Sequence, residues 1–290
     1  MGGRFEHSTD VAAGGWIAPR LGGEFGAVGL VCPTGFEAYA RVFHPVGEGR
    51  LRWSEVCAVT GRTAHPLMQW GRISGTLHGT RYFGGWEEGD PDQGTPDQGT
   101  PDEGALDVDG LAALAHAIGG DTGITIGVWT GYGQYNPGST STVSFAYAAG
   151  DDGAGGTADE GAAASASASG PAASAGFEPT FDAGLPFRPT LDLPGREYGL
   201  FRGRLATLRD PGWREASGWA WRWSDTLNLA WPDDRSWFVA SEIDFDSTVV
   251  GGSRALVDRV LASDLETAEV DQTSDLSWEG DLVNPSGPTA

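Results

Sequence analysis

Three acidic side chains, Glu242, Asp244 and Asp246, alternate along the segment WFVASEIDFDSTVVGGS at positions 237–253. Residues 236–250 form the strongest strand region of the chain, although the segment is long enough to contain a bulge or a turn. In one extended strand, alternate side chains share a face and lie about 6.7 Å apart. Carboxylate oxygens grouped in this way are ligands for Mg²⁺, Mn²⁺ or Ca²⁺. The pattern therefore gives a candidate divalent metal site.

The same three charges allow two other interpretations. They form a solvated strand face that prevents edge-to-edge aggregation, or they pair with arginines in a structural cluster. The metal hypothesis also depends on the register of the strand, because a one-residue bulge within 236–250 would distribute the acids over both faces.

A second candidate is an aromatic surface. Trp219, Trp221 and Trp223 occupy alternate positions of the segment GWAWRW and lie on one face if that segment is extended. Rings arranged in this way stack on sugars, bases or prolines, and Arg222 adds a charge. Arg235, which follows the turn sequence WPDD, is a further candidate for a ligand or partner surface. The alternative is that these tryptophans fill a core that contains few isoleucines.

Other common catalytic and cofactor motifs are missing from the sequence. The histidines form no HxH or HExxH spacing, and Cys32 and Cys57 alone leave no four-cysteine zinc site. A nucleophile pair of Cys57 and His65 has no motif that would orient it. The chain contains no lysine, which excludes a Walker-type nucleotide site, and no GxSxG segment. We therefore expect no cofactor other than a divalent metal.

The charge of the chain restricts its partners. Its 40 acidic and 18 basic residues give a formal net charge of −22. Nucleic acids and anionic membrane surfaces attract cationic proteins, so we expect neither as a partner. No apolar run reaches the roughly 18 residues of a membrane helix, and the first residues, MGGRFEHSTD, lack the basic and apolar regions of a secretory signal. We expect a cytoplasmic protein.

Much of the acidity lies in two low-complexity inserts. Residues 87–105 include the repeats PDQGT, PDQGT and PDEGA, in which Pro and Gly interrupt any helix or strand. Residues 150–176 consist almost wholly of Gly, Ala, Ser and Asp, and burial of such side chains cannot offset the entropy of ordering them. We predict that both inserts are disordered.

The rest of the sequence predicts an α+β fold, mainly an antiparallel sheet with a few short helices. Turn residues separate most of the predicted strands, which favours hairpins over repeated βαβ units. The predicted helices are capped by Ser54, Asp109 and Ser253, which are residue types of the N-cap position. The predicted strands span residues 26–32, 36–46, 124–130, 142–148, 198–205, 227–231, 236–250 and 265–270.

Each half of the sequence is long enough to fold alone. We nevertheless favour a single domain at 1–284 that the two inserts interrupt, because the closure entropy of a surface loop rises only with the logarithm of its length. The alternative is two domains at 1–149 and 177–284.

Five segments outside the inserts carry a family resemblance. They are GFEAYARVFHP at 35–45, HPLMQW at 65–70, GVWTGYG at 127–133, YGLFRG at 198–203 and WPDDRSWFVASEIDFDSTVVGGS at 231–253. Together they resemble a family of conserved hypothetical proteins from actinobacteria. The resemblance implies one interrupted domain and places the carboxylate segment and the glycine-rich turns in the shared core of the family. It also favours a GC-rich genome over a halophilic source as the reason for the missing lysines, and it implies no activity.

Two functions agree with these patterns. The first is a non-enzymatic, cytoplasmic protein-binding protein of an immunity-like or regulatory kind, whose acidic inserts engage a basic partner. The second is a divalent-metal-dependent enzyme or ligand-binding domain that uses Glu242, Asp244 and Asp246. We favour the first, because the sequence contains no nucleotide loop, catalytic triad motif or zinc set.

The two hypotheses predict different responses of stability to Mg²⁺, Mn²⁺ and Ca²⁺. If the carboxylates hold an ion, an ion at about 100 times its Kd stabilises the fold by about 2.7 kcal/mol, or about 5–10 °C in Tm. The substitution Asp244→Asn then abolishes that shift. A protein-binding protein shows no shift, and the substitution is neutral or stabilising because it relieves like-charge repulsion. Thermal unfolding in chelator and then in each ion, at matched ionic strength, makes the comparison.

Overall fold

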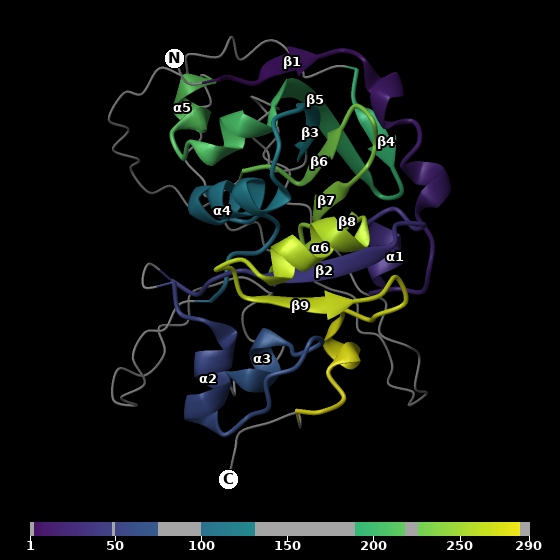
Figure 1. Ribbon diagram of the computed structural model, residues 1–290. Helices are drawn as coiled ribbons and strands as arrows, with labels where there is room; N and C mark the ends of the chain where they lie inside the picture. Colours follow the sequence, from purple (N-terminus) through teal and green to yellow (C-terminus); the bar gives the residue numbers. More distant parts are fainter. Residues whose placement is uncertain (1–2, 48–49, 75–99, 131–188, 218–225, 285–290) are drawn as a thin grey trace, which may run out of the picture.

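The computed structural model describes residues 3–47, 50–74, 100–130, 189–217 and 226–284 (Figure 1). Its strands are β1 (Glu6–Ser8), β2 (Ala38–Phe43), β3 (Gly123–Trp129), β4 (Leu191–Leu193), β5 (Arg196–Arg204), β6 (Leu229–Pro232), β7 (Phe238–Ser241), β8 (Ser247–Gly252) and β9 (Thr267–Val270). Its α-helices are α1 (Val28–Val31), α2 (Trp53–Thr60), α3 (Trp70–Ile73), α4 (Val108–Ile118), α5 (Trp213–Ala216) and α6 (Arg254–Leu261). Short 3-10 helices are η1 (Val11–Gly14), η2 (Ala18–Arg20), η4 (Leu205–Arg209) and η5 (Trp278–Gly280).

The described strands form one antiparallel sheet in the order β1-β5-β3-β6-β7-β8-β2-β9, and β4 pairs with β5. This confirms the predicted α+β class with a mainly antiparallel sheet. Strands from the first half of the chain lie between strands from the second. β3 lies between β5 and β6, and β2 lies between β8 and β9. The two halves therefore share one hydrogen-bonded sheet.

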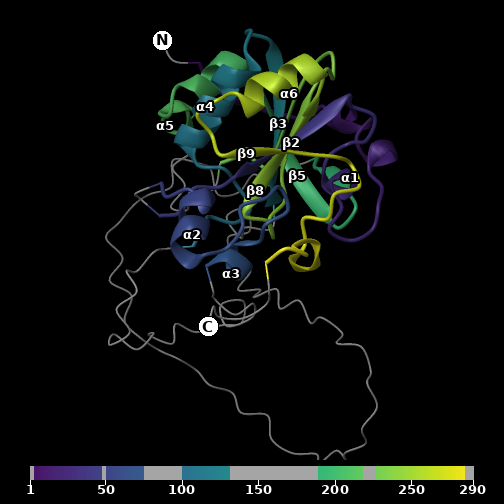
Figure 2. The same ribbon diagram turned by 60° about the horizontal axis from the view of Figure 1, so that its bottom comes forward.

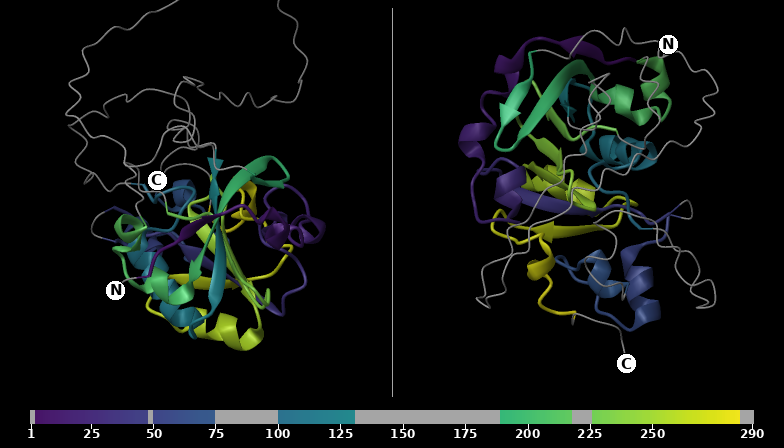
Figure 3. Two further views of the ribbon diagram at one scale, coloured as in Figure 1. Left: turned by 90° about the horizontal axis from the view of Figure 1, so that it is seen from above. Right: turned by 180° about the vertical axis from the view of Figure 1, so that it is seen from behind.

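Both faces of the sheet are covered (Figures 2 and 3). On one face, α4 and α6 contribute Leu111, Leu114 and Val257 to a core that includes inward-facing residues of β2, β3 and β8. On the other face, the N-terminal segment packs Ile17 and Val28 into a second core. Strands that are buried on both faces need apolar residues at nearly every position, which explains why several segments do not alternate strictly.

A third cluster lies where α2 and α3 pack below β9 in the view of Figure 1. Its aromatic centre is formed by Trp53 and Trp70, whose ring centroids lie 5.6 Å apart. The carboxylate of Glu266, next to β9, accepts hydrogen bonds from the main-chain N–H groups of Trp53 and Ser54 at 2.6 and 2.7 Å. An acidic side chain of the neighbouring segment thus satisfies the free amides at the start of α2.

The three predicted helices are confirmed, with differences at their first residues. Ser253 caps α6 as predicted and accepts a hydrogen bond from the N–H of Leu256 at 3.3 Å. The cap of α4 is Asp107 and not Asp109, and it accepts from the N–H of Gly110 at 2.7 Å. Helix α2 begins at Trp53, so Ser54 lies inside it.

Two predicted strands differ from the structure. Residues 26–32 contain the single-turn helix α1, and the N–H groups of Val28 and Gly29 donate to the carbonyls of Ser274 and Gln272. Sequence period does not distinguish a short buried strand from a buried helical turn. Residues 236–250 form the hairpin of β7 and β8 instead of one strand.

The two inserts lie mostly beyond the described residues. These include neither 150–176 nor 87–99, nor the predicted strand at 142–148. Residues 100–105 are described and packed, so the prediction of disorder was wrong for the end of the first insert. Pro101 forms a β-bridge with Val46, and Ala105 is buried next to the fully buried Leu106. Pro101 and Ala105 belong to the last repeat, PDEGA, and their burial orders this end of the first insert.

In the described part of the chain, no helix has the length and apolar character that crossing a bilayer requires.

Candidate functional site

The three candidate carboxylates lie in the turn of a hairpin. β7 ends at Ser241, β8 begins at Ser247, and the turn between them contains Glu242, Asp244 and Asp246. The strands pair antiparallel, so the chain reverses within 236–250, where the metal hypothesis required one extended strand. The acids therefore do not form a row on one strand face.

Arginines hold these carboxylates. The Nη2 group of Arg196 donates to Glu242 Oε1 at 2.8 Å and to Asp244 Oδ2 at 2.9 Å. Asp246 faces Arg41 instead, with 3.5 Å between Asp246 Oδ1 and Nη2. No group of three or more His, Cys, Asp or Glu that could hold a metal ion occurs among the described residues. The contacts match the arginine-paired alternative, and metal binding by these residues stays a prediction.

The guanidinium of Arg41 is fully buried on β2 and joins three parts of the chain. Its Nε donates to the hydroxyl of Ser247 at 2.9 Å, and its Nη1 donates to the carbonyls of Pro66 at 3.2 Å and Met68 at 2.9 Å. Burial lowers the pKa of Arg41 to about 10, although the nearby Asp246 raises it. The side chain is therefore still charged at neutral pH. It links β2, the β7–β8 hairpin and the segment 66–68.

The predicted aromatic surface is not placed. The described residues do not include its four members, Trp219, Trp221, Arg222 and Trp223. Arg235 is described and exposed in the β6–β7 connection.

Arg235 contacts the N-terminal segment. Its guanidinium lies 5.7 Å from the ring centroid of Trp16, and Arg20 lies 5.6 Å from the same ring. Cations near an indole face are attracted to it. Arg235 therefore has a structural contact, and a role for it in binding a partner stays a prediction.

A buried polar network lies where β2, β7 and β8 meet. His44 Nε2 is 2.8 Å from Thr248 Oγ1, which is 2.6 Å from Ser241 Oγ, and His44 Nδ1 is 2.6 Å from the carbonyl of Asp102. The carbonyl requires that Nδ1 donate, so Nε2 accepts from the threonine hydroxyl. His44, Thr248 and Ser241 are each no more than 1% exposed. This network therefore anchors the segment at Asp102 and offers no surface to a substrate.

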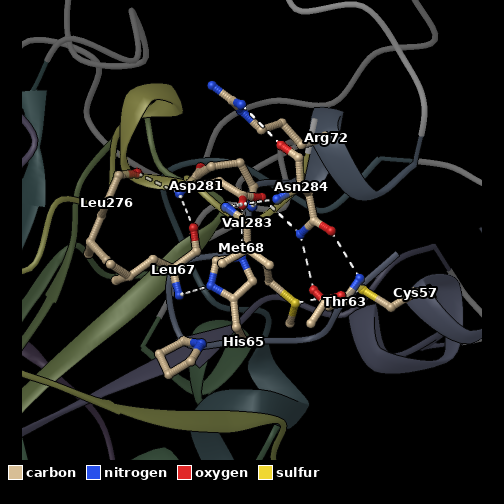
Figure 4. A network of polar contacts seen from close by, with 12 residues as sticks. Cys57, Thr63, His65, Leu67, Met68, Arg72, Leu276, Asp281, Val283 and Asn284 are labelled. Atoms are coloured by element: carbon tan, nitrogen blue, oxygen red, sulfur yellow. Dashed lines mark hydrogen bonds and ion pairs between the residues drawn. The ribbon is translucent and has the colours of Figure 1, made fainter. Parts of the chain in front are cut away.

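A second network surrounds the fully buried carboxylate of Asp281 (Figure 4). Asp281 accepts hydrogen bonds from His65 Nε2 at 2.8 Å, from Gln69 N at 3.1 Å and from Asn284 N at 2.9 Å. The side chain of Asn284 in turn bonds both main-chain groups of Thr63 at 2.9 and 3.0 Å. These contacts attach the segment 281–284 to the segment 63–69.

The charge of Asp281 is stabilised by these donors. Burial raises the pKa of Asp281, but hydrogen bonds from Asn284, Gln69 and His65 outweigh it, and the net shift is downward. The imidazole of His65 is fixed from both sides, because its Nδ1 also accepts from the N–H of Leu67 at 3.3 Å. Neither ring nitrogen of His65 is left to take a proton from a substrate.

A surface groove of about 390 Å³ opens beside His65. Residues 65–67 form one wall, and the other is formed by Glu269 and Val270 of β9 with Asp271 and Ser274. β9 is the last strand of the sheet. The groove therefore lies beside the end of the last described strand of the sheet, and its opposite wall is held by Arg41 and Asp281.

Sequence reasoning did not single out Arg41, Asp281 or Asn284. The nucleophile pair that it considered is not formed, because His65 contacts Asp281 whereas Cys57 Sγ lies 3.9 Å from Met68 Sδ. One usable signal was the spacing of Asp281 and Asn284, since Asp and Asn side chains often bond the main chain of a following turn.

Comparison with protein-family models, with curated proteins and with solved structures gives no match. Function is therefore inferred from the geometry above, and the resemblance to the actinobacterial family stays a prediction.

We expect the substitution His44→Gln to reduce the loss of stability in acid. Burial lowers the pKa of His44 to about 4, whereas the unfolded chain binds a proton near pH 6.5. The stability that neutral His44 contributes is complete above pH 6.5 and is lost as the pH falls toward 4, by roughly 3 kcal/mol. Urea unfolding of both proteins across this range measures the difference.

Burial raises the pKa values of Glu242 and Asp246, so their protonation in acid adds to stability instead of lowering it. This effect is the same in the parent protein and in His44→Gln. It cancels in the comparison. Equal acid losses in the parent and in His44→Gln would contradict a buried neutral histidine.

Proposed function

We propose that this chain is a non-enzymatic, cytoplasmic protein-binding protein of a regulatory or immunity-like kind, and that the groove beside β9 receives its partner. The observation that carries the proposal is the groove itself, which is open to solvent and lies on the terminal strand of the sheet. Clefts with fixed walls and grooves at sheet edges are common sites for peptide segments of partners.

The wall opposite β9 is preorganised. Arg41 bonds the carbonyls of Pro66 and Met68, and Asp281 bonds His65 at 2.8 Å. A wall that is already ordered in the free protein does not have to be ordered on binding, so less free energy is lost. The structure thus supports a binding site that exists before the partner arrives.

The polar groups around the groove bond the chain itself. Both nitrogens of His65 are engaged, and the hydroxyl of Ser274 accepts from the N–H of Asp271 at 3.1 Å. Glu269 pairs with Arg254 at 2.7 Å. Catalysis needs a nucleophile or a base that faces the substrate. The engaged side chains favour binding over a reaction in this groove.

The net charge of −22 favours a basic partner. Opposite charges on two proteins accelerate their encounter and suppress association with like-charged proteins. This supports the same class of partner that the acidic inserts indicate.

The proposal is tested by panning a displayed library of random peptides against the full chain. We expect selected peptides to bind the parent protein and to lose affinity roughly tenfold, about 1.4 kcal/mol, in Pro66→Trp. The indole fills the groove, whereas the carbonyl that Arg41 holds is retained. Pro66 is exposed, so the variant is expected to fold, and its Tm verifies this.

The matched control is Pro194→Trp, because Pro194 is exposed in the β4–β5 turn away from β9. Selected peptides are expected to bind it as tightly as they bind the parent. The proposal fails if panning enriches no peptide, or if both tryptophan variants bind the selected peptides equally well.

A further inference from the structure

We infer that the partner binds as an additional β-strand on the free edge of β9, and that the segment that binds is extended and basic. This inference rests on the proposed function and specifies how the groove is occupied and by what chemistry.

Within the described part of the chain, the hydrogen-bond pattern leaves one edge of β9 unpaired. The N–H of Phe43 donates to the carbonyl of Glu266 at 2.9 Å. In an antiparallel ladder this bonding recurs at every second residue, so Ala268 and Val270 are the residues of β9 that bond β2. Thr267 and Glu269 lie between the bonded residues, so their N–H and C=O groups point away from β2. No described strand, turn or side chain bonds these main-chain groups.

An open strand edge is a template for another strand. Its unpaired N–H and C=O groups supply the affinity, and pockets beside the edge select side chains. The groove provides such a pocket, because it is lined by β9 on one side and by residues 65–67 on the other. Of the four residues of β9, the groove borders the last two, Glu269 and Val270, and we place the partner strand at this end.

The charge of the edge indicates a basic partner. Glu269 and Asp271 are exposed and both line the groove. Glu269 forms an ion pair with Arg254. The carboxylate of Asp271 instead accepts hydrogen bonds from Thr273 in its own turn, at 2.8 Å from N and 2.5 Å from Oγ1. These hydrogen bonds lower the pKa of Asp271 and keep it ionised.

Two other occupants fit less well. A second copy of the chain paired through β9 would place Glu269 and Asp271 on both strands, and the residues of β9 include no basic side chain to match them. The inserts at 87–105 and 150–176 contain acidic residues and no arginine, so charge also disfavours them. An arginine-rich or lysine-rich strand from a different protein matches the edge best.

The test uses synthetic peptides and the full-length chain. The probe is a seven-residue peptide in which arginine and valine alternate, and its analogue carries glutamate in place of arginine. We expect the basic peptide to bind and the acidic analogue to bind at least about tenfold more weakly by fluorescence anisotropy. Equal affinities would overturn the assignment of a basic partner.

Main-chain pairing is tested by methylating peptide nitrogens without changing the protein. One analogue carries N-methyl groups at the odd residues and another at the even residues. Only one of these sets faces β9 in a paired strand, so we expect one analogue to lose about tenfold in affinity and the other to bind with unchanged affinity. Equal affinities of the two analogues would overturn strand addition.

A charge variant locates the bound peptide. The double substitution Glu269→Gln and Asp271→Asn is expected to weaken the basic peptide about tenfold. The control, Glu6→Gln with Asp192→Asn, makes the same change in net charge on β1 and β4, at the opposite side of the sheet. An equal loss in both variants would show a general effect of charge and would overturn the assignment to β9.

These outcomes separate the inference from the proposed function. One outcome is that selected peptides lose affinity in Pro66→Trp and yet are neither basic nor paired through their main chain. That result would overturn the inference and leave the proposed function standing. Absence of any peptide that responds to Pro66→Trp would overturn both.

Discussion

A charged guanidinium in a protein interior loses several kcal/mol of hydration, so its donors must all find partners. Four hydrogen bonds from Arg41 reach the carbonyls of Pro66 and Met68, the carboxylate of Asp246 and a hydroxyl of β8. Its plane also lies over the ring of Phe43, 4.5 Å from the centroid. These groups come from separate parts of the chain, and the buried charge requires all of them in one arrangement.

The groove beside β9 follows from this arrangement. Arg41 fixes the carbonyls on either side of Leu67, while the buried Asp281 fixes His65. Because Arg41 and Asp281 each bond the segment 65–68, that segment is held in a fixed position beside the sheet edge. Among the described strands, β9 pairs with β2 alone, so no described strand pairs with its outer edge. A rigid wall opposite an unpaired edge is the geometry that strand addition needs.

Local signals were sufficient for several elements. Helix α6 was located within a few residues by its cap at Ser253 and its apolar spacing. Strands β3 and β5 were located equally well by their apolar runs. The length of 236–250 allowed a turn, but the sequence did not locate it, because residues 242–246 contain no Gly, Pro or Asn and the alternation of acids continues through them. Its charges are held by Arg196 and Arg41, which lie on other strands. The site itself was missed for the same reason, since its wall is set by contacts between separate segments: Arg41 bonds residues 66 and 68, and Asp281 bonds residues 65 and 69, more than 200 positions away.

The most direct measurement is residue-resolved amide hydrogen exchange of the full chain, alone and saturated with the alternating arginine–valine peptide. The free edge predicts that the amides of Thr267 and Glu269 exchange readily in the free protein and slow by about tenfold or more with peptide bound. The amides of Ala268 and Val270, which face β2, change little. Slowing at β1 or β4 instead, or no change at Thr267 and Glu269 while the peptide is bound, would contradict binding at the edge of β9.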